Sequence, residues 1–210
     1  MSDLVVVELL IPLAYLLGTF PSAGIVARRN GIDVTAAGSG NPGASNTFRL
    51  LGWRAGALVF GLDALKGALA ALAGVLIDGH RGLYILGIAA ILGHTLPVMR
   101  RFKGGRGVAT AAGVLVVLFP LLTLAMSALW GAIVWLTHKA SLASVIVAIC
   151  APIAVAAAGH PWSDITPIAL LGAIVVARHL SNLRRLVRGE ELGFAHHDDD
   201  PEEGDQRAAG

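Results

Sequence analysis

Three segments of the chain combine glycine with polar and cationic residues, and each lies between long apolar runs. The first, residues 37–49, reads Ala-Gly-Ser-Gly-Asn-Pro-Gly-Ala-Ser-Asn-Thr-Phe-Arg. Its glycines allow the backbone to turn N–H groups into a concavity that binds anions. Arg49 adds a planar set of donors suited to a phosphate. The alternative is a connecting loop that needs glycine only in order to turn.

The second segment, residues 100–110, reads Arg-Arg-Phe-Lys-Gly-Gly-Arg-Gly-Val-Ala-Thr and runs directly into an apolar helix. Its glycines expose N–H groups at a helix amino terminus, where the helix dipole also favours an anion. The four cationic side chains strengthen that preference. A basic stop that anchors the chain to lipid headgroups would explain the arginines, but it does not need three glycines at this spacing.

The third segment, residues 178–191, is helical by its apolar spacing and carries His179 and Asn182 three positions apart. Residues three apart share a helix face, so both side chains could reach one polar ligand at the membrane boundary. A terminal histidine that complements the helix dipole is the alternative. Glu190 and Glu191 are expected to pair with the arginines of residues 184–188 as a structural contact.

Four further polar residues lie within or beside apolar runs. Asp63 and Lys66 are spaced for an ion pair inside a predicted span, where charged residues are either functional or paired for packing. His94 comes shortly before the second segment. Ser141 begins a span, where its hydroxyl could contact a ligand or cap the helix.

The composition excludes a soluble globular protein. Of 210 residues, 55% are hydrophobic and only 14% are charged, against roughly 25% charged in soluble domains.

A membrane span needs roughly 20 apolar helical residues. Pro120 is expected to split residues 107–137 into two short helices joined as a hairpin. The sequence thus predicts an all-α integral membrane protein with seven transmembrane helices, at residues 4–27, 55–77, 82–99, 107–137 (two), 140–158 and 165–178. If residues 107–137 form one tilted helix, the number is six.

Charge sets the expected orientation. With the amino terminus outside, nearly all Lys and Arg residues fall on the inner side and Arg81 alone lies outside, as the positive-inside rule prefers. The carboxyl terminus is then cytoplasmic, and all three polar segments meet the cytoplasmic face. Residues 1–194 form the membrane domain in this interpretation. Residues 195–210, which are acidic and poor in apolar side chains, form a disordered cytoplasmic tail.

Two anion-binding loops, several cations and a His/Asn pair on one face indicate a site for two phosphate-bearing substrates, at least one of which arrives from the bilayer. No set of residues has the spacing of metal ligands, and the single cysteine rules out a thiolate cluster. We therefore expect neither a metal nor a cofactor. Nucleic acid is not expected as a partner, because the basic residues lie between apolar runs rather than on a polar domain.

The three segments together resemble the PlsY family of bacterial membrane acyltransferases, over residues 10–191. The matching patterns are Gly-Ser-Gly-Asn-x-Gly-Ala-x-Asn-x-x-Arg, Lys-Gly-Gly-x-Gly-Val-Ala-Thr and Arg-His-x-x-Asn-x-x-Arg, in this order. The resemblance implies a seven-helix enzyme of the bacterial plasma (inner) membrane, with its active site on the cytoplasmic face. Such an enzyme transfers an acyl chain from acyl phosphate to the 1-hydroxyl of sn-glycerol 3-phosphate. The products are lysophosphatidic acid and inorganic phosphate, in the first acylation step of bacterial phospholipid synthesis.

The resemblance also assigns roles to residues. Ser39, Arg49, His179 and Asn182 match catalytic positions of the family. We expect the first loop to hold acyl phosphate and the second to hold glycerol 3-phosphate, together with His179 and Asn182. Arg106 stands where the family usually carries lysine, which keeps the charge but alters the geometry. The expected substrate-binding residues are Gly38, Gly40, Asn41, Gly43, Asn46, Lys103, Gly104, Gly105, Arg106, Gly107 and Ser141.

The implied chemistry suits these residue types. Acyl phosphate is an activated mixed anhydride, so the enzyme needs no nucleophile of its own, and positioning and charge neutralisation dominate. Whether His179 removes the hydroxyl proton or only orients the substrate stays open, as does docking of the soluble enzyme that makes acyl phosphate. The other class of function that fits is a transporter or channel for a phosphorylated solute, but it predicts an internal repeat that the sequence does not show convincingly.

Overall fold

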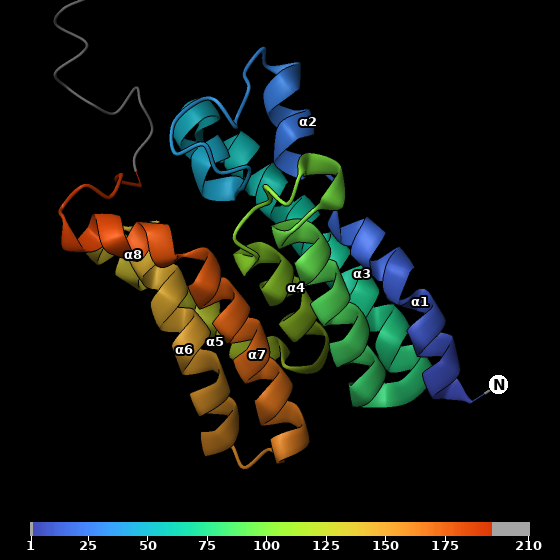
Figure 1. Ribbon diagram of the computed structural model, residues 1–210. Coiled ribbons are helices and arrows are strands. Elements are labelled where there is room, and N and C mark those ends of the chain that lie inside the picture. The colour runs from blue at the N-terminus through green and yellow to red at the C-terminus, as the bar shows by residue number, and fades with distance from the viewer. Residues whose placement is uncertain (1, 195–210) are drawn as a thin grey trace, which may run out of the picture.

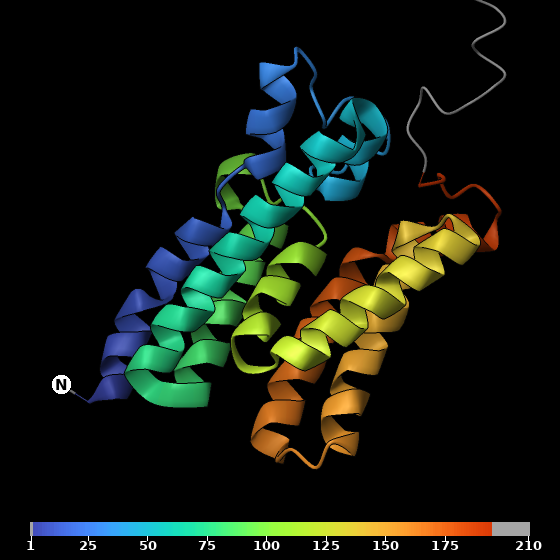
Figure 2. The same ribbon diagram turned by 180° about the vertical axis from the view of Figure 1, so that it is seen from behind.

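The computed structural model describes residues 2–194, and the predicted acidic tail lies outside these residues. The described part of the chain consists of helices and the segments that connect them, without a strand (Figures 1 and 2). The elements are α1 (Asp3–Gly18), α2 (Ser22–Arg29), α3 (Ala44–Thr95), the 3₁₀ turn η1 (Val98–Arg100), α4 (Val108–Leu118), α5 (Pro120–Thr137), α6 (Ala140–Ala157), α7 (Trp162–Arg178) and α8 (Leu180–Val187).

Helix α3 is not one straight rod. Its backbone leaves the helical region at Gly52 (φ 79°) and again at Asp78 and Gly79 (φ −138° and 54°). The second break reverses the chain, so that two limbs, residues 53–77 and 80–95, lie side by side (Figure 1). The limbs approach closely at Gly74 and Gly82, where a Cβ on Gly74 would lie 2.2 Å from the carbonyl oxygen of Gly82. The two spans predicted on either side of residues 78–81 are therefore one hairpin.

The predicted interruption at Pro120 is confirmed. Helix α4 ends at Leu118, Phe119 is not helical (φ −126°, ψ 60°), and α5 begins at Pro120. Proline has no N–H for the preceding turn, which explains why the helix stops there. Figures 1 and 2 show the chain turning back at this point.

Seven helical segments of residues 2–194 thus alternate in direction, namely α1, the two limbs of α3, α4, α5, α6 and α7 (Figures 1 and 2). By length and apolar composition, four helical stretches of the described chain qualify to cross a membrane, or five if α7 and α8, which bend by 55°, count as one. One of these stretches contains both limbs of α3. Helix α4 has 11 residues and is about 16 Å long, shorter than a single crossing requires.

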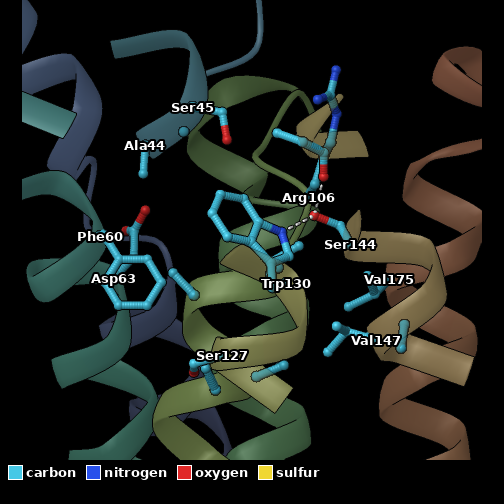
Figure 3. A pocket seen from close by; sticks show the side chains of 18 of the residues that line it. Ala44, Ser45, Phe60, Asp63, Arg106, Ser127, Trp130, Ser144, Val147 and Val175 are labelled. Atoms are coloured by element: carbon cyan, nitrogen blue, oxygen red, sulfur yellow. Dashed lines mark hydrogen bonds between the residues drawn. The ribbon is translucent and has the colours of Figure 1, made fainter. Parts of the chain in front are cut away.

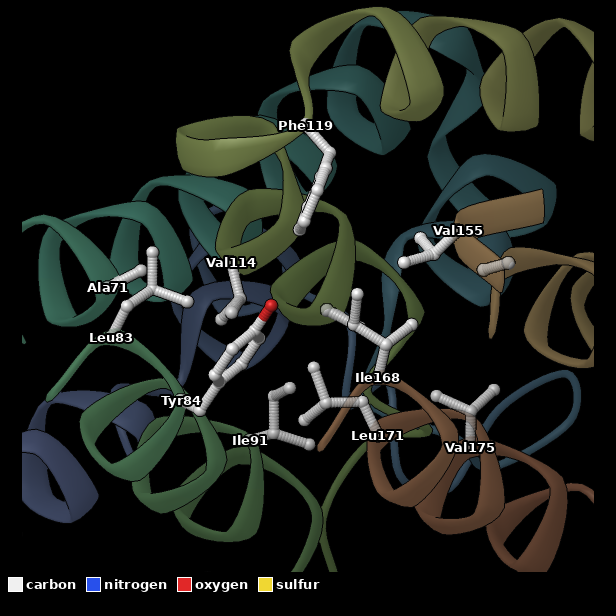
Figure 4. Close-up of a cluster of buried hydrophobic side chains, with 12 residues drawn as sticks. Ala71, Leu83, Tyr84, Ile91, Val114, Phe119, Val155, Ile168, Leu171 and Val175 are labelled. Atoms are coloured by element: carbon white, nitrogen blue, oxygen red, sulfur yellow. The ribbon is translucent and has the colours of Figure 1, made fainter. Parts of the chain in front are cut away.

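The core lies between α3, α4 and α7. Leu83, Ile91, Val114, Ile168 and Leu171 are each at most 2% exposed and pack together (Figure 4). Glycine allows α4 to pack tightly on α3, since a Cβ on residue 113 would lie only 1.9 Å from the backbone oxygen of residue 64. Small residues at helix crossings are typical of membrane proteins, where van der Waals packing holds helices together.

The polar segments gather at one end of the bundle. The loop before α3, the loop before α4 and helix α8 lie together there, as the sequence predicted (Figures 1 and 2). At the opposite end lie the start of α1, the turn at Asp78 and the connection between α6 and α7 (Figure 1). The fold therefore brings three segments that are far apart in the sequence to one place.

The predicted start of the last span was wrong. The last span was expected from residue 165, but α7 begins at Trp162. Asp164 lies in the first turn of α7 and is 2% exposed. Its Oδ1 accepts a hydrogen bond from the Tyr84 hydroxyl (3.0 Å) and contacts His80 Nδ1 (2.8 Å). The carboxylate ties α7 to α3, and these partners could not be inferred from the local sequence.

Candidate active site

A cavity of about 520 Å³ opens at the loop end, between α3, α4, α5, α6 and α7. Its polar wall includes Asn41, Arg106, Ser141 and His179. Most of the remaining wall is apolar; its side chains include Leu115, Met126, Ala151, Ile168 and Leu171. Figure 3 shows the middle of the cavity, where Trp130 and Phe60 face each other across it. A mostly apolar pocket with a few converging polar groups is the usual form of a small-molecule site.

Asn46 holds the first loop in shape. Its Oδ1 accepts a hydrogen bond from the Ser39 N–H (2.9 Å), and its Nδ2 donates to the carbonyl oxygens of Val34 (3.0 Å) and Ala37 (3.1 Å). Gly38 has φ 58°, and a Cβ there would lie 2.4 Å from Asn46 Oδ1. Asn46 was expected to bind substrate, but its amide is used by the loop and it does not line the cavity.

Some of the other residues of the first loop line the cavity, and the rest shape the loop. Asn41 and Gly43 line the cavity. Ser39 is half-buried and lies off the wall, where its hydroxyl accepts a long hydrogen bond from the Asn41 N–H (3.4 Å). Gly40 has φ 68°, a left-handed conformation that favours glycine. The loop thus presents Asn41 to the cavity rather than Ser39.

The second loop is fixed from two sides. The Gly105 N–H donates to the carbonyl oxygen of His94 (3.1 Å). The Arg178 guanidinium donates to the carbonyl oxygens of Gly104 (3.0 Å) and Gly105 (3.3 Å). Gly107, with φ 86°, then starts α4. This role of Arg178 was not found from the sequence, because an arginine at the end of a span is equally expected from the positive-inside rule.

The two cationic residues Arg106 and Lys103 differ in their position relative to the cavity. Arg106 lines the cavity, whereas Lys103 is exposed and off its wall. Burial lowers the pKa of Arg106 to about 10, and the attraction of Glu191 only partly offsets that effect. Arg106 therefore keeps its charge at neutral pH. With Arg49 and Arg178 nearby, it makes this part of the wall strongly cationic.

Glu191 joins the start of α6 to α8. Its side chain accepts hydrogen bonds from Asn182 Nδ2 (2.5 Å) and Arg185 Nε (2.8 Å). Its backbone oxygen accepts one from Lys139 Nζ. The carboxylate is buried, with 5% of the residue exposed. The expected pairing with a nearby arginine is confirmed for Glu191, with Arg185 as the partner, whereas Glu190 makes no ion pair within residues 2–194.

Three predicted site residues around Glu191 have buried polar atoms without a hydrogen-bond partner in the described chain. These atoms are Arg49 Nη1, Ser141 Oγ and Asn182 Oδ1. Arg49 is otherwise held by a bond from its Nε to the carbonyl oxygen of Gly193 (2.6 Å). A buried polar group without a partner costs about 1–3 kcal/mol, and such groups call for an explanation. A polar ligand that bridges the three side chains would satisfy them together.

His179 has a defined tautomer. Its ring is 2% exposed, and Nδ1 lies 2.8 Å from the carbonyl oxygen of Val175. A carbonyl oxygen only accepts hydrogen bonds, so Nδ1 carries the proton. In the neutral ring Nε2 then has a free lone pair. Because His179 lines the cavity, it can accept a proton from a ligand there.

Comparison with known proteins identifies the family. The family model described as "Glycerol-3-phosphate acyltransferase" matches residues 8–189. The chain belongs to this family. The glycerol-3-phosphate acyltransferase of Bacillus velezensis is 40% identical over 186 residues, which cover 88% of this chain and 96% of the relative. That of Aquifex aeolicus is 40% identical, covering 88% of this chain and 97% of the relative.

Two solved structures of the family share the fold. Both are of PlsY (YgiH), described as an integral membrane glycerol 3-phosphate acyltransferase, and both are 39% identical to this chain. The glycerol 3-phosphate form has a TM-score of 0.85 and covers 90% of this chain and 96% of the solved one. The lysophosphatidic acid form has a TM-score of 0.84, with coverage of 90% and 95%.

Membership in the acyltransferase family decides between the two classes of function that the sequence left open. The chain is an acyltransferase and a multi-pass membrane protein, not a transporter. The resemblance to the PlsY family, on which the expected site rests, is confirmed. Of the expected site residues, Asn41, Gly43, Arg106, Gly107, Ser141 and His179 line the cavity.

An aromatic group on the cavity wall was missed from the sequence. Phe194 stacks on Phe48 with ring centroids 4.4 Å apart, and the rings of Trp130 and Phe194 are perpendicular with centroids 5.7 Å apart. Trp130 Nε1 donates to Ser144 Oγ at 3.0 Å (Figure 3). These residues come from α3, α5, α6 and the segment after α8, so no local pattern could have shown that they meet in this acyltransferase.

Glu191 makes stability depend on pH. Burial acts to raise its pKa, but the hydrogen bonds from Asn182 and Arg185 and the positive charge of Arg185 outweigh burial and hold the pKa below 4.5, its ordinary value. A lowered pKa in the folded state means that the stabilisation is complete above 4.5 and is lost as the pH falls through the lower, folded-state value. We expect the melting temperature of the wild type to fall more steeply below this pH than that of Glu191→Gln. Thermal unfolding of both proteins across this range measures the difference, and parallel curves would contradict it.

Proposed function

We propose that the protein transfers an acyl chain from acyl phosphate to the 1-hydroxyl of sn-glycerol 3-phosphate, which yields lysophosphatidic acid and inorganic phosphate. The observation that carries the proposal is the group of unpaired atoms on Arg49, Ser141 and Asn182 around Glu191, next to a mostly apolar cavity whose wall includes Ser141 and Arg106. Phosphate oxygens would pair with the polar group, and an acyl chain would fill the apolar part. The names of the solved relatives, which mention glycerol 3-phosphate and lysophosphatidic acid, support the acceptor and the product.

The choice of acyl phosphate as donor rests on the chemistry of the wall. A donor with a poor leaving group would favour an enzyme nucleophile activated by a base. Ser39 lies off the cavity wall, and among residues 2–194 His179 has its only side-chain hydrogen bond with a backbone carbonyl. Acyl phosphate already has a good leaving group, so direct attack by the acceptor hydroxyl is sufficient.

The proposed step has one base and several cations. His179 Nε2 accepts the proton of the 1-hydroxyl as that oxygen attacks the acyl carbonyl carbon. The bond between the carbonyl carbon and the phosphate oxygen then breaks, and phosphate leaves with the electron pair. Arg49 and Arg106 offset the negative charge of the two phosphates, which lowers the barrier electrostatically. The proton on His179 passes to the departing phosphate, so His179 returns to its starting form.

The loops have separate tasks in this proposal. The first loop, which places Asn41 on the cavity wall, holds acyl phosphate together with Arg49. The second loop, with Lys103 and Arg106, holds glycerol 3-phosphate together with His179 and Asn182. Because the backbone N–H groups of a glycine-rich loop before a helix favour anions, each loop suits one phosphate.

We also propose that the chain crosses the bacterial plasma (inner) membrane seven times, with its amino terminus outside and its active site on the cytoplasmic face. The seven alternating segments support this number. The basic residues support the orientation under the positive-inside rule, since nearly all of them belong to segments at the loop end. Residues at the loop end include Arg28, Arg29, Arg49, Arg100, Arg101, Lys103, Arg106 and Arg178.

The test is a donor comparison with purified protein in detergent. Palmitoyl phosphate and palmitoyl-CoA are each supplied with glycerol 3-phosphate, and lysophosphatidic acid is followed with each donor. We expect lysophosphatidic acid only from palmitoyl phosphate, and none when glycerol 3-phosphate is omitted. Product from palmitoyl-CoA at an equal or higher rate would overturn the proposed donor, while the acyltransferase assignment would stand.

A further inference from the structure

A buried charged network lies behind the second loop and outside the proposed catalytic groups. Lys66 Nζ contacts Asp63 Oδ1 at 2.8 Å, His94 Nδ1 at 2.8 Å and the carbonyl oxygen of Phe20 at 3.2 Å. Asp63 Oδ1 also accepts a hydrogen bond from Ser22 Oγ at 2.8 Å. Asp63, Lys66 and His94 are each at most 5% exposed. The pairing of Asp63 with Lys66, one of the two possibilities considered from the sequence, is confirmed.

The network fixes the tautomer of His94. A lysine ammonium has three N–H donors and no acceptor. Its three neighbours here are a carboxylate oxygen, a carbonyl oxygen and His94 Nδ1, one for each donor. His94 Nδ1 must therefore accept a hydrogen bond and cannot carry a proton. In the neutral ring the proton is on Nε2, so Nε2 is a donor.

The Nε2 atom faces the second loop and the cavity. A Cβ on Gly105 would lie 2.1 Å from His94 Nε2, so only glycine leaves room for the ring there. His94 lines the cavity together with Asp63 and Arg106 (Asp63 and Arg106 are labelled in Figure 3). Within residues 2–194, the only side-chain hydrogen bond of His94 is made by Nδ1. The Nε2–H donor therefore has no hydrogen bond within residues 2–194 and is available to a ligand where the second loop meets the cavity.

We propose that His94 is a further substrate-binding residue, whose Nε2–H donates a hydrogen bond to a phosphate oxygen of a substrate held by the second loop. This inference rests on the proposed function. The two histidines of the cavity then have complementary tautomers, because His179 Nε2 accepts and His94 Nε2 donates. The Lys66–Asp63 pair acts as a positioning pair that keeps the proton of His94 on the side of the substrate.

Two substitutions separate this role from a structural one. In His94→Asn, the side-chain oxygen can take the position of Nδ1 and accept from Lys66, but the Nε2 donor is lost. In His94→Gln, the side-chain amide nitrogen can reach the position of Nε2 and donate, but the acceptor for Lys66 is lost. If His94 only satisfies Lys66, His94→Asn keeps activity and His94→Gln loses it. Our proposal predicts the reverse order.

The measurement is the KM for each substrate in both variants, together with the melting temperature of each. A hydrogen bond to a charged group is worth about 1.5–3 kcal/mol, which corresponds to a change of roughly 10- to 150-fold. We expect His94→Asn to raise the KM for one substrate by such a factor while its melting temperature stays near the wild-type value. In His94→Gln, we expect the KM for that substrate to be close to the wild-type value. A raised KM for glycerol 3-phosphate identifies its phosphate as the acceptor, and a raised KM for palmitoyl phosphate identifies the phosphate of the donor. Unchanged KM values in folded His94→Asn overturn the proposal.

A binding experiment on the wild type gives an independent readout. In protein labelled with ¹⁵N-histidine, His94 is expected to show a protonated Nε2 whose signal shifts when glycerol 3-phosphate or a non-transferable phosphonate analogue of acyl phosphate is added. A proton on Nδ1, or no shift with either ligand, would contradict the inference. If wild-type protein binds glycerol 3-phosphate yet transfers no acyl group from palmitoyl phosphate, the proposed reaction fails while the His94 contact is still tested.

Discussion

Replacing His179 with asparagine is expected to lower kcat about 100- to 10,000-fold, the usual contribution of a positioned general base. The asparagine amide can still donate to the Val175 carbonyl oxygen, which His179 Nδ1 contacts at 2.8 Å. The variant therefore keeps the contact at the end of α7 and loses only the proton-accepting nitrogen. Initial rates at saturating concentrations of both substrates measure this effect.

The matched control is His138→Asn. His138 is exposed and has a left-handed backbone (φ 54°), a conformation that asparagine tolerates. Its side chain does not line the cavity, so kcat should stay at the wild-type value. If His179→Asn unfolds at the wild-type temperature and also keeps the wild-type kcat, His179 is not the base.

Adding a methyl group to the second loop should lower catalytic activity nearly as much as removing the base, His179. In Gly105→Ala, the new Cβ would lie 2.1 Å from His94 Nε2 and 2.6 Å from His94 Cε1, so the loop or the ring must move. Misplacing a substrate by about 1 Å costs on the order of 100-fold in rate. We therefore expect kcat/KM for glycerol 3-phosphate to fall by about this factor. Steady-state kinetics with acyl phosphate held saturating measure the loss.

A glycine-to-alanine substitution away from the site is the control for the loss of activity expected in Gly105→Ala. A Cβ on Gly131, inside α5, meets nothing within 4 Å. Alanine favours a helix interior over glycine by about 1 kcal/mol, so Gly131→Ala should keep its activity and not melt earlier. If Gly105→Ala and Gly131→Ala have the same kcat/KM for glycerol 3-phosphate, catalysis does not depend on the exact conformation of the second loop.

The sequence predicted the helix boundaries best where the chemistry is local. Pro120 stops α4 because proline lacks an N–H, and this effect needs no partner from elsewhere in the chain. The gathering of the three polar segments at one end also followed from the sequence, because successive spans cross in alternate directions and the basic residues set their orientation. By contrast, the first turn of α7 was left out of the predicted span, which began at residue 165. Its buried Asp164 is satisfied by Tyr84 and His80, which lie 80 or more positions away in the chain.

Within the site, the sequence identified the motifs but did not show which of their side chains point toward the cavity. Asn41 and Asn46 belong to one motif, yet the left-handed turns at Gly38 and Gly40 leave Asn41 on the cavity wall and Asn46 among backbone carbonyls. The role of His94 depends on Lys66, which lies on the other limb of α3. Such contacts arise from the hairpin in α3 and have no signature in the sequence around either residue.

The most direct test of direct acyl transfer is the time course of phosphate release from palmitoyl phosphate in the first turnover, without and with glycerol 3-phosphate. We predict no burst of phosphate without glycerol 3-phosphate, since no acyl-enzyme forms. With both substrates present, phosphate and lysophosphatidic acid should appear together in a one-to-one ratio. A burst equal to the enzyme concentration in the absence of glycerol 3-phosphate would contradict direct transfer and would require a nucleophile on the protein.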